Sequence, residues 1–299
     1  MSRAIYRSVS ELRGFSLKSA DPMPGPRGIL MCPPDYFDVV DVKNPFMVGQ
    51  AGKVAKDAAR RQWEGVRRAF EAAGKPVSSI EPLANLEDMT FCANTCFTGL
   101  SPSGERICLL SQMLHPSRRR EVAASEAFFQ ALGYRIAHLR DREAFFEGGG
   151  DALWHPERRL VWGGYGFRSN INPYEDIAAL FDAPVILLKL VNERFYHLDT
   201  CFCPLTSEAV LIHAAAFDAA SLELILKIFP MVVSIGEEEA VEAMALNGCV
   251  VDGKTVVIHH GAKAASRHIQ AMGLEVSHVD TSEFHKSGGS VYCLKNFIF

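Results

Sequence analysis

Four side chains that could carry out nucleophilic catalysis stand beside short apolar or glycine-rich runs: Glu147 in "FEGGGDALW", His197 and Asp199 in "YHLDT", and Cys293 in "GGSVYC". A cysteine acts as a nucleophile when its pKa is lowered or a partner takes its proton, a histidine can carry that proton, and a carboxylate can orient the histidine. Taken singly, His197 is equally typical of a hydrogen-bonded core histidine and Cys293 of a small buried residue. Together they indicate thiol chemistry.

Glu147 directly precedes three glycines, Gly148 to Gly150. Such a run costs chain entropy and offers no side chain for packing, so it normally marks a place where another group approaches the backbone closely. A tight loop between two elements is the alternative. The residues alone leave both interpretations open.

Two further carboxylates, Asp88 and Asp199, suit a cationic ligand, and a planar guanidinium is the cation that carboxylate pairs match best. Asp88 and Asn94 have the same parity in "DMTFCAN", and His197 and Asp199 have the same parity in "YHLDT". If these segments are strands, each pair shares one face. For Asp88, a turn or helix cap is the structural alternative.

Short β-rich runs alternate with helical stretches along the chain, separated by polar or glycine-rich breaks. We expect strands in 28–34, 88–97, 106–111, 159–166, 184–190, 195–205, 209–217, 232–236, 248–260, 275–280 and 289–299. We expect helices over 50–74, 120–132, 172–182, 218–228, 237–246 and 262–273, several of which end at a glycine. This alternation predicts a repeated α/β architecture in one continuous domain over 1–299, with 1–27 as an N-terminal extension.

Composition narrows the function classes. The net charge of -4 over 299 residues leaves no basic field for nucleic acid, and no stretch approaches the roughly 18 apolar residues of a membrane span. The segment "GGYGFR" leads into a turn rather than a helix, which disfavours a dinucleotide site. We therefore expect a cytoplasmic protein with a small-molecule or protein partner.

The eight cysteines are expected to be reduced thiols, because the chain shows no export signal. Cys201-x-Cys203 and Cys92-xxx-Cys96 could suggest metal ligands, but neither spacing recurs in a matched pair. We expect no metal site, and we expect Cys201 and Cys203 to be small buried residues on one face of a strand.

The ordered set "MCPPDYFDVVDVKNPFM", "DMTFCAN", "HPSRRRE", "FEGGGDALW", "GYGFRSN", "FYHLDTCFCPL" and "GGSVYC" resembles the guanidino-group-modifying amidinotransferase superfamily. Its members include arginine deiminases, arginine dihydrolases, dimethylarginine dimethylaminohydrolases and amidinotransferases. The resemblance runs from about residue 28 to the C-terminus. It implies the pentein fold, an α/β propeller of five ββαβ-like units around a pseudo-fivefold axis with the active site at its centre.

The resemblance also implies roles for individual residues. Cys293 matches the nucleophile, His197 the general acid and base, and Glu147 the carboxylate that hydrogen-bonds that histidine. Asp199 matches the carboxylate that holds the guanidinium, and Asp88 begins a motif that supplies another substrate contact. The remaining matches are Asn94, which favours the dihydrolase-like branch, Asn44 in "KNPFM", which lines the site in relatives, and Arg118 and Arg168, the candidates for binding a substrate carboxylate.

The implied activity is hydrolysis of a guanidino carbon–nitrogen bond in arginine or an N-methylated arginine, through a covalent cysteine intermediate and without a metal or organic cofactor. Dimethylarginine hydrolysis and amidino transfer stay open, because "CANTCF" and "EGGGD" depart from the expected dihydrolase pattern. A non-catalytic pentein binding protein is a further alternative. For Arg118 and Arg168, a surface salt bridge is the structural alternative. A homo-oligomer is compatible with all of these.

Overall fold

The computed structural model describes residues 4–299, and its strands form five separate sheets. Each sheet contains a strand paired antiparallel to a second strand, which is in turn paired parallel to a third. The five triplets are β16 (Asn296–Ile298), β2 (Gly28–Met31) and β3 (Val77–Ser79); β4 (Cys96–Leu100), β5 (Arg106–Leu110) and β6 (Arg135–Ala137); β7 (Ala152–Trp154), β8 (Val161–Tyr165) and β9 (Val185–Lys189); β10 (Phe202–Pro204), β11 (Ala209–Ile212) and β12 (Met231–Ser234); and β13 (Cys249–Val250), β14 (Thr255–His259) and β15 (Glu275–Val279).

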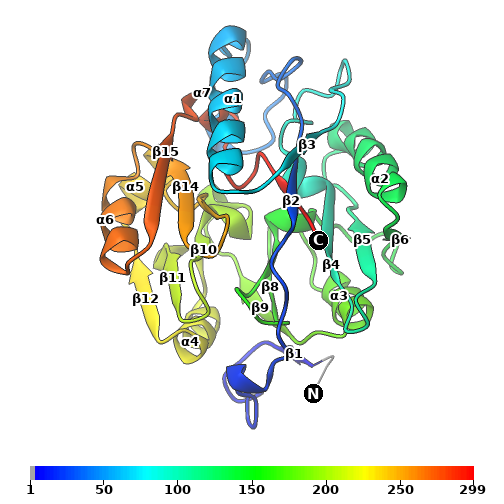
Figure 1. The fold of residues 1–299 in the computed structure, drawn as a ribbon, viewed down its shortest axis with the longest axis vertical. Helices are drawn as coiled ribbons and strands as arrows, with labels where there is room; N and C mark the ends of the chain where they lie inside the picture. The colour runs from blue at the N-terminus through cyan, green and yellow to red at the C-terminus, as the bar shows by residue number, and fades with distance from the viewer. Residues whose placement is uncertain (1–3) are drawn as a thin grey trace.

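A helix joins the second and third strand of every triplet, because a parallel pair needs a long crossover. These helices are α1 (Lys56–Ala72), α2 (Val122–Ala131), α3 (Pro173–Phe181), α4 (Ala219–Ile228) and α6 (Lys263–Ala271), and they lie around the outside of the strands (Figure 1). The chain therefore repeats one ββαβ unit five times, and β16 completes the unit of β2 and β3. The α/β pentein prediction is confirmed; the rotational symmetry of the units stays a prediction.

The predicted helices are all present, with ends that differ by a few residues. Helix α1 begins six residues after the predicted start, and α2 follows a 3-10 helix, η4 (Pro116–Glu121). Gly74, Gly133 and Gly273 follow α1, α2 and α6 with φ between 76° and 79°, which is the conformation that favours glycine after a helix. Helix α5 (Glu237–Glu242) is shorter than predicted, and α7 (Ser282–His285) was not predicted.

The N-terminal segment packs on the domain. Strand β1 (Ile5–Tyr6) pairs parallel with β9 and so adds a fourth strand to that sheet. Tyr6 and Leu12 are buried in the largest apolar cluster, and a 3-10 helix, η1 (Leu17–Ser19), follows them. The treatment of 1–27 as one domain with the rest stays a prediction.

Three predicted strands are mostly turns instead. In 88–97, a 3-10 helix, η3 (Cys92–Thr95), precedes β4; in 195–205, η7 (Leu198–Thr200) precedes β10; and in 289–299 only β16 is a strand. The Thr95 hydroxyl donates to the Cys92 carbonyl at 2.9 Å, and the Thr200 hydroxyl donates to the His197 carbonyl at 2.6 Å. These local bonds compete with strand pairing, so the parity argument for Asp88 with Asn94 and for His197 with Asp199 was wrong. The other 3-10 helices are η2 (Pro45–Met47), η5 (Gly148–Gly150), η6 (Glu193–Phe195) and η8 (Ala214–Ala216).

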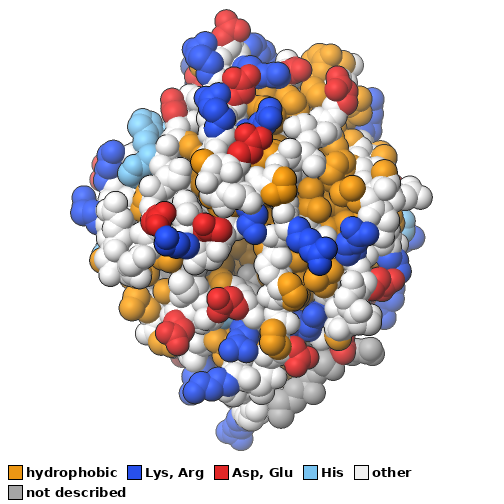
Figure 2. Space-filling model, viewed as in Figure 1, with side chains coloured by type: hydrophobic (Ala, Val, Ile, Leu, Met, Phe, Trp, Pro, Cys, Tyr) orange, Lys and Arg blue, Asp and Glu red, His pale blue; other side chains and the backbone are white. Residues whose placement is uncertain are grey.

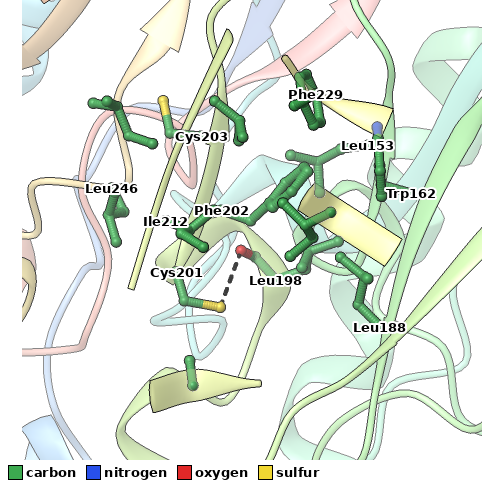
Figure 3. Packing of buried hydrophobic residues seen from close by; sticks show 14 of the residues in the cluster. Leu153, Trp162, Leu188, Leu198, Cys201, Phe202, Cys203, Ile212, Phe229 and Leu246 are labelled. Atoms are coloured by element: carbon green, nitrogen blue, oxygen red, sulfur yellow. Dashed lines mark hydrogen bonds between the residues drawn. The ribbon is translucent and has the colours of Figure 1, made fainter. Parts of the chain in front are cut away.

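Cys201 and Cys203 lie in an apolar core with Phe202, Trp162 and Phe229 (Figure 3). The Cys201 thiol points toward the Leu198 carbonyl at 3.6 Å. Their interpretation as small buried residues is confirmed, although only Cys203 lies on a strand, since Cys201 belongs to the turn before β10.

Across residues 4–299, no helix has the length and apolar character that a membrane crossing requires. Figure 2 shows lysine and arginine side chains interspersed with aspartate and glutamate on the face in view.

Candidate active site

The turns that replace the predicted strands bring most of the predicted site residues to one cavity. Thirteen residues line it: Lys43, Asn44, Met47, Asp88, Phe91, Asn94, Arg118, Arg168, Tyr196, His197, Ser287, Gly289 and Cys293. Seven of these were predicted from the sequence. The other two predicted residues lie directly behind the lining, Glu147 against His197 and Asp199 against Cys293.

His197 is buried and contacts polar groups through both ring nitrogens. Its Nε2 lies 2.8 Å from Glu147 Oε2, and its Nδ1 lies 3.5 Å from Asn94 Nδ2. Because a carboxylate can only accept, this network places the proton of the neutral ring on Nε2. The unprotonated Nδ1 then faces Asn94, a residue of the cavity lining, and can take up or release a proton there.

Glu147 is fully buried and keeps its charge. Burial alone would raise the pKa of its carboxyl, but Arg168 and His197 outweigh that effect and hold the pKa well below its usual range. Oε2 accepts from Arg168 Nη1 at 2.9 Å, and Oε1 accepts from the Leu114 backbone N–H at 3.1 Å. The carboxylate is thus fixed on both oxygens.

The glycines after Glu147 pack closely against other parts of the protein. They form η5, which packs against η3. A Cβ on Gly148, where φ is 55°, would lie 2.6 Å from the Cys96 carbonyl oxygen, and a Cβ on Gly150 would lie 2.3 Å from Asn94 Nδ2. The close approach is therefore to protein backbone and to a site side chain, and it sets Glu147 behind His197.

Cys293 lies in the turn between α7 and β16, where its sulfur contacts two polar side chains. Asn247 Nδ2 donates to Sγ at 3.1 Å, and the thiol donates to Asp199 Oδ2 at 3.2 Å. Asn247 Oδ1 accepts the backbone N–H groups of Ser290 and Cys293, which fixes the turn. Burial and the charge of Asp199 raise the pKa of this thiol well above its usual value.

Asp199 carries an oxygen available to a donor. Its carboxylate is buried, and Oδ1 has no hydrogen-bond partner among residues 4–299. Burial raises its pKa to about 7, opposed by the Cys293 thiol and by the charge of Lys295. A buried acceptor without a donor is costly, so a cationic N–H group beside the Cys293 sulfur would relieve it.

Lys295 is an unusual neighbour of this turn. It is 1 % exposed, forms no ion pair among the described residues, and its Nζ lies 3.1 Å from the ring centroid of Tyr292 and 3.7 Å from that of Phe297. Burial lowers its pKa to about 8, while Cys249, Asp199 and Cys293 act in the opposite direction. It supplies positive charge behind the site.

Arg118 and Arg168 are both buried, so the surface salt-bridge alternative was wrong for each. Arg118 donates to Glu121, to Asn94 Oδ1 at 3.1 Å and to the Asp88 carbonyl at 3.3 Å. Arg168 donates to Glu147 and to the Lys43 carbonyl at 2.8 Å, and lies over the Tyr196 ring. Both reach the cavity while held by other groups.

Asn44, Asp88 and Lys43 also line the cavity. Asn44 is the N-cap of η2 and donates to the Ser287 carbonyl at 3.0 Å, which ties the N-terminal segment to the segment before Cys293. Asp88 Oδ1 accepts from the Ser287 hydroxyl at 3.2 Å, and Oδ2 lies 3.0 Å from Lys43 Nζ. Asp88 is thus buried beside Lys43, and it also lies in a turn in which the Phe91 N–H donates to the Asp88 carbonyl at 2.9 Å, so the turn interpretation describes its backbone.

Sequence reasoning missed Lys43, Tyr196, Asn247 and Asp151. Asp151 accepts from Ser169 Oγ at 2.6 Å and from the Leu198 backbone N–H at 3.0 Å, which positions the turn that carries His197. Asp151 lies in "FEGGGDALW" and Lys43 in "MCPPDYFDVVDVKNPFM", so the family motifs could have indicated both residues. Asn247, in "LNGC", is distant in sequence from every motif, so no motif indicated it.

Among the described residues, one group has potential metal-ligand atoms within 4.8 Å of one another: His259, His260 and Asp280. It contains no cysteine, so neither Cys201-x-Cys203 nor Cys92-xxx-Cys96 forms a ligand set there. His259 Nδ1 already accepts from the Thr281 backbone N–H at 3.2 Å. That nitrogen lone pair is therefore in use.

A family model described as N,N dimethylarginine dimethylhydrolase, eukaryotic, matches residues 35–299. The chain belongs to this dimethylarginine dimethylaminohydrolase family. The dimethylarginine dimethylaminohydrolase of Mycobacterium tuberculosis is 35% identical over 270 residues, which cover 90% of this chain and 85% of that protein.

Two longer relatives are named as bifunctional enzymes with a second activity. The bifunctional arginine dihydrolase/ornithine cyclodeaminase AgrE of Nostoc sp. is 37% identical over 267 residues, which cover 89% of this chain but 37% of AgrE. The chain therefore spans little more than a third of the length of that relative. The N-terminal domain of ArgZ, a cyanobacterial arginine dihydrolase solved with its product, superposes with a TM-score of 0.85 at 34% identity, covering 91% of this chain and 97% of that domain.

Proposed function

We propose that this protein is a hydrolase that acts on a carbon–nitrogen bond of the guanidino group of arginine or an N-methylated arginine, through a covalent intermediate on Cys293. The observation that carries this proposal is the combination of the Cys293 sulfur, a buried His197–Glu147 pair and a carboxylate oxygen of Asp199 without a donor, all at one cavity.

Substrate binding would precede the chemistry. The guanidinium donates to Asp199 Oδ1 and places its central carbon near the Cys293 sulfur. A bound cation favours the thiolate over the thiol and so offsets the raised pKa of Cys293. The substrate carboxylate would accept from the N–H groups of Arg168 and Arg118 that the protein leaves without an acceptor.

The proton of the Cys293 thiol passes to His197 Nδ1, and the thiolate attacks the guanidinium carbon to give a tetrahedral adduct. One nitrogen leaves as ammonia or an alkylamine after it takes a proton from His197, which leaves an S-alkylated isothiouronium on Cys293. His197 Nδ1 next takes a proton from water as the water attacks the same carbon. The thiolate departs, and the product carries a ureido group. Glu147 keeps the His197 ring oriented and stabilises its protonated form.

A second candidate within this chemistry is dimethylarginine hydrolysis with release of dimethylamine, favoured by the family model and by the mycobacterial relative. AgrE and ArgZ, named as arginine dihydrolases, favour the unmethylated substrate. Methyl groups on the guanidinium would remove N–H groups that could donate to Asp199, so the contact with Asp199 favours arginine over a methylated arginine. Amidino transfer differs only in its last step, in which an amine replaces water as the acceptor of the amidino group. A non-catalytic pentein binding protein would not require the His197–Glu147 pair for proton transfer.

A substrate panel tests the proposal. Arginine, monomethylarginine, asymmetric dimethylarginine and agmatine are incubated with the protein, and citrulline, ornithine, ammonia and methylamines are quantified. Citrulline with one ammonia per arginine indicates a deiminase, and ornithine with two ammonia per arginine indicates a dihydrolase. Release of dimethylamine while arginine stays unreacted would favour dimethylarginine hydrolysis over arginine hydrolysis. No turnover of any compound, with Cys293 shown to be reduced, would refute hydrolysis.

We further expect the protein to act in the cytoplasm and expect that its partner is a small guanidino compound. A homo-oligomer is part of the proposal, and the mass in solution, measured by light scattering, tests it.

A further inference from the structure

A second cavity, which we call the aromatic cavity, lies on the face in view in Figure 2. That face is hollowed near its centre, between the positions that β10 and the C-terminus take in Figure 1. The volume of the aromatic cavity is about 350 Å³, and small-molecule sites have volumes of roughly 300–1,000 Å³. Among the described residues, it shares no lining residue with the cavity at Cys293. A ligand in it would therefore leave the lining of the catalytic cavity free.

Aromatic side chains form much of the wall of the aromatic cavity. They are Trp154, Phe202, Tyr292, Phe297 and Phe299. Trp154, Tyr292 and Phe297 are half-buried, so part of each side chain stays accessible. Aromatic rings pack favourably against one another in offset or edge-to-face arrangements. The wall therefore suits a flat apolar group.

Lys75 supplies the aromatic cavity with a cation that has no counter-charge. It lines the cavity, is half-buried and forms no ion pair among residues 4–299. Its Nζ donates to the Pro26 carbonyl at 2.6 Å, which leaves the other N–H donors of the ammonium without an acceptor in the described chain. The Tyr292 hydroxyl has no hydrogen-bond partner there either. These donors suit an anionic oxygen.

Lys295 places a second positive charge beside the same wall. It is buried, and its Nζ contacts the rings of Tyr292 and Phe297. Burial raises the pKa of the Cys249 thiol, which lies between two lining residues, and the charges of Lys295 and Lys75 both oppose this rise. The two ammonium groups therefore act on one part of the wall. Because a buried charge without a partner is costly, an anion in the aromatic cavity would stabilise both cations.

The carboxylates of the lining, Asp252 and Glu157, do not supply that anion. Both side chains are exposed, so solvent and salt screen their charges. Asp252 Oδ1 accepts from the backbone N–H groups of Lys254 at 2.9 Å and Thr255 at 2.6 Å. Glu157 Oε2 accepts from the Ser207 hydroxyl at 3.3 Å. Both carboxylates are thus bound to groups of their own loops.

We propose that the aromatic cavity is a second ligand site, which binds an aromatic carboxylate. The ring of the ligand packs against the aromatic wall, and its carboxylate accepts hydrogen bonds from Lys75 Nζ. Lys295 adds to the preference for an anion over a neutral or cationic ligand. This site is independent of the proposed guanidino hydrolysis and goes beyond it.

The first test is isothermal titration calorimetry with 2-naphthylacetate and with 2-naphthylacetamide, which has the same ring system and no charge. The acid should bind with a Kd about tenfold or more below that of the amide, which is the scale of one charge-assisted hydrogen bond. Lys75→Met should raise the Kd of the acid by a similar factor and leave that of the amide unchanged. Lys227→Met, at an exposed lysine of α4, is the matched control and should change neither Kd.

Photolabelling of the wild-type protein locates the bound compound without any variant. The photoreactive aromatic carboxylate 4-benzoylbenzoate is irradiated with the protein, and tandem mass spectrometry maps the modified residue. The modification should fall on Phe297 or in 202–206, which line the aromatic cavity. A modification on Met47 or Tyr196 would overturn the proposal, because it would place the carboxylate at Arg118 and Arg168 in the cavity at Cys293.

Three further results would overturn the proposal. They are the absence of binding by both naphthyl compounds, equal Kd values for the acid and the amide, and an unchanged Kd of the acid in Lys75→Met that circular dichroism shows to be folded. None of these results bears on the guanidino chemistry, which the substrate panel tests separately.

Discussion

Glu147 Oε2 accepts hydrogen bonds from two site residues at once, from His197 Nε2 at 2.8 Å and from Arg168 Nη1 at 2.9 Å. One carboxylate oxygen therefore sets both the orientation of the imidazole and the position of the guanidinium fork. Because the whole arrangement is buried, loss of the carboxylate would leave Arg168 without its counter-charge in a region of low dielectric.

This relationship predicts different outcomes for two substitutions. His197→Ala should abolish turnover, since no other group takes over its proton transfer. Glu147→Gln keeps the shape but loses the charge, so the rate should fall by about 10² to 10⁴ while the protein still folds. Steady-state rates and a thermal melt of each variant check this. Normal turnover by His197→Ala would refute its role, and an unfolded Glu147→Gln would make Glu147 a structural residue.

The glycine loop should tolerate no side chain at Gly148. Gly148→Ala would force a Cβ into the carbonyl oxygens of Cys96, Ala93 and Asn94 at a positive φ, so we expect a loss of about 1–3 kcal/mol of unfolding free energy and a displaced Glu147. Gly65→Ala is the matched control, because Gly65 lies in α1 with no atom within 4 Å of its Cβ position. There we expect a stability gain of about 0.5–1 kcal/mol. Urea unfolding of both variants gives the comparison, and equal effects would contradict the account.

Cys293 should react selectively with a substrate-like electrophile. All eight cysteines are buried, but among them Cys293 lines the cavity within the part of the chain that the structure describes. A substoichiometric haloacetamidine resembles the guanidinium and should label Cys293 first. Peptide mapping by mass spectrometry locates the adduct. Label on Cys32, Cys201 or Cys203 with Cys293 unmodified would disprove the assignment.

Lys295 gives a pH-dependent prediction. Its pKa is about 8 in the folded protein against an ordinary 10.5, so between these pH values the unfolded chain binds more protons and the protein gains stability as pH rises. Lys295→Met removes a buried charge at similar volume and should be more stable by about 1–3 kcal/mol at pH 7, with that advantage shrinking toward pH 10.

Urea unfolding at pH 7 and pH 10 measures this difference. Lys254→Met, where the lysine is exposed, should show no such advantage at either pH. A Lys295→Met variant that is less stable at pH 7 would mean that the cation–π contacts with Tyr292 and Phe297 outweigh the cost of burying the charge.

The helices and most strands were predictable because their side chains repeat with a clear period and end at residues such as Gly74 and Gly133. The turns were not, because "DMTFCAN" and "FYHLDT" are as apolar as a strand. Thr95, directly after the first segment, and Thr200, at the end of the second, donate hydroxyl hydrogen bonds to the carbonyls three residues earlier. The family motifs still identified residues that meet at the cavity, since a motif fixes positions without fixing the local conformation.

Long-range contacts limited the rest of the site prediction. Asn247 reaches Cys293 from a distant loop, and Lys43 lies beside Asp88, which is 45 positions later in the sequence, so no local pattern encodes either contact. The burial of Arg118 was also not predictable, because the sequence "HPSRRRE" is typical of a solvent-exposed charged segment. In the structure Glu121 is buried too and forms the ion pair with Arg118. These residues differ from the predicted ones in being defined by tertiary packing.

The central claim is that Cys293 forms a covalent bond to the guanidino carbon of the substrate. Acid quenching during turnover of a guanidino carboxylate, followed by peptide mapping, measures this directly. The account predicts that the Cys293 peptide gains the mass of the substrate less its leaving amine, and that Cys293→Ser shows neither this adduct nor product. An adduct on another cysteine, or product formation by Cys293→Ser at the wild-type rate, would contradict it.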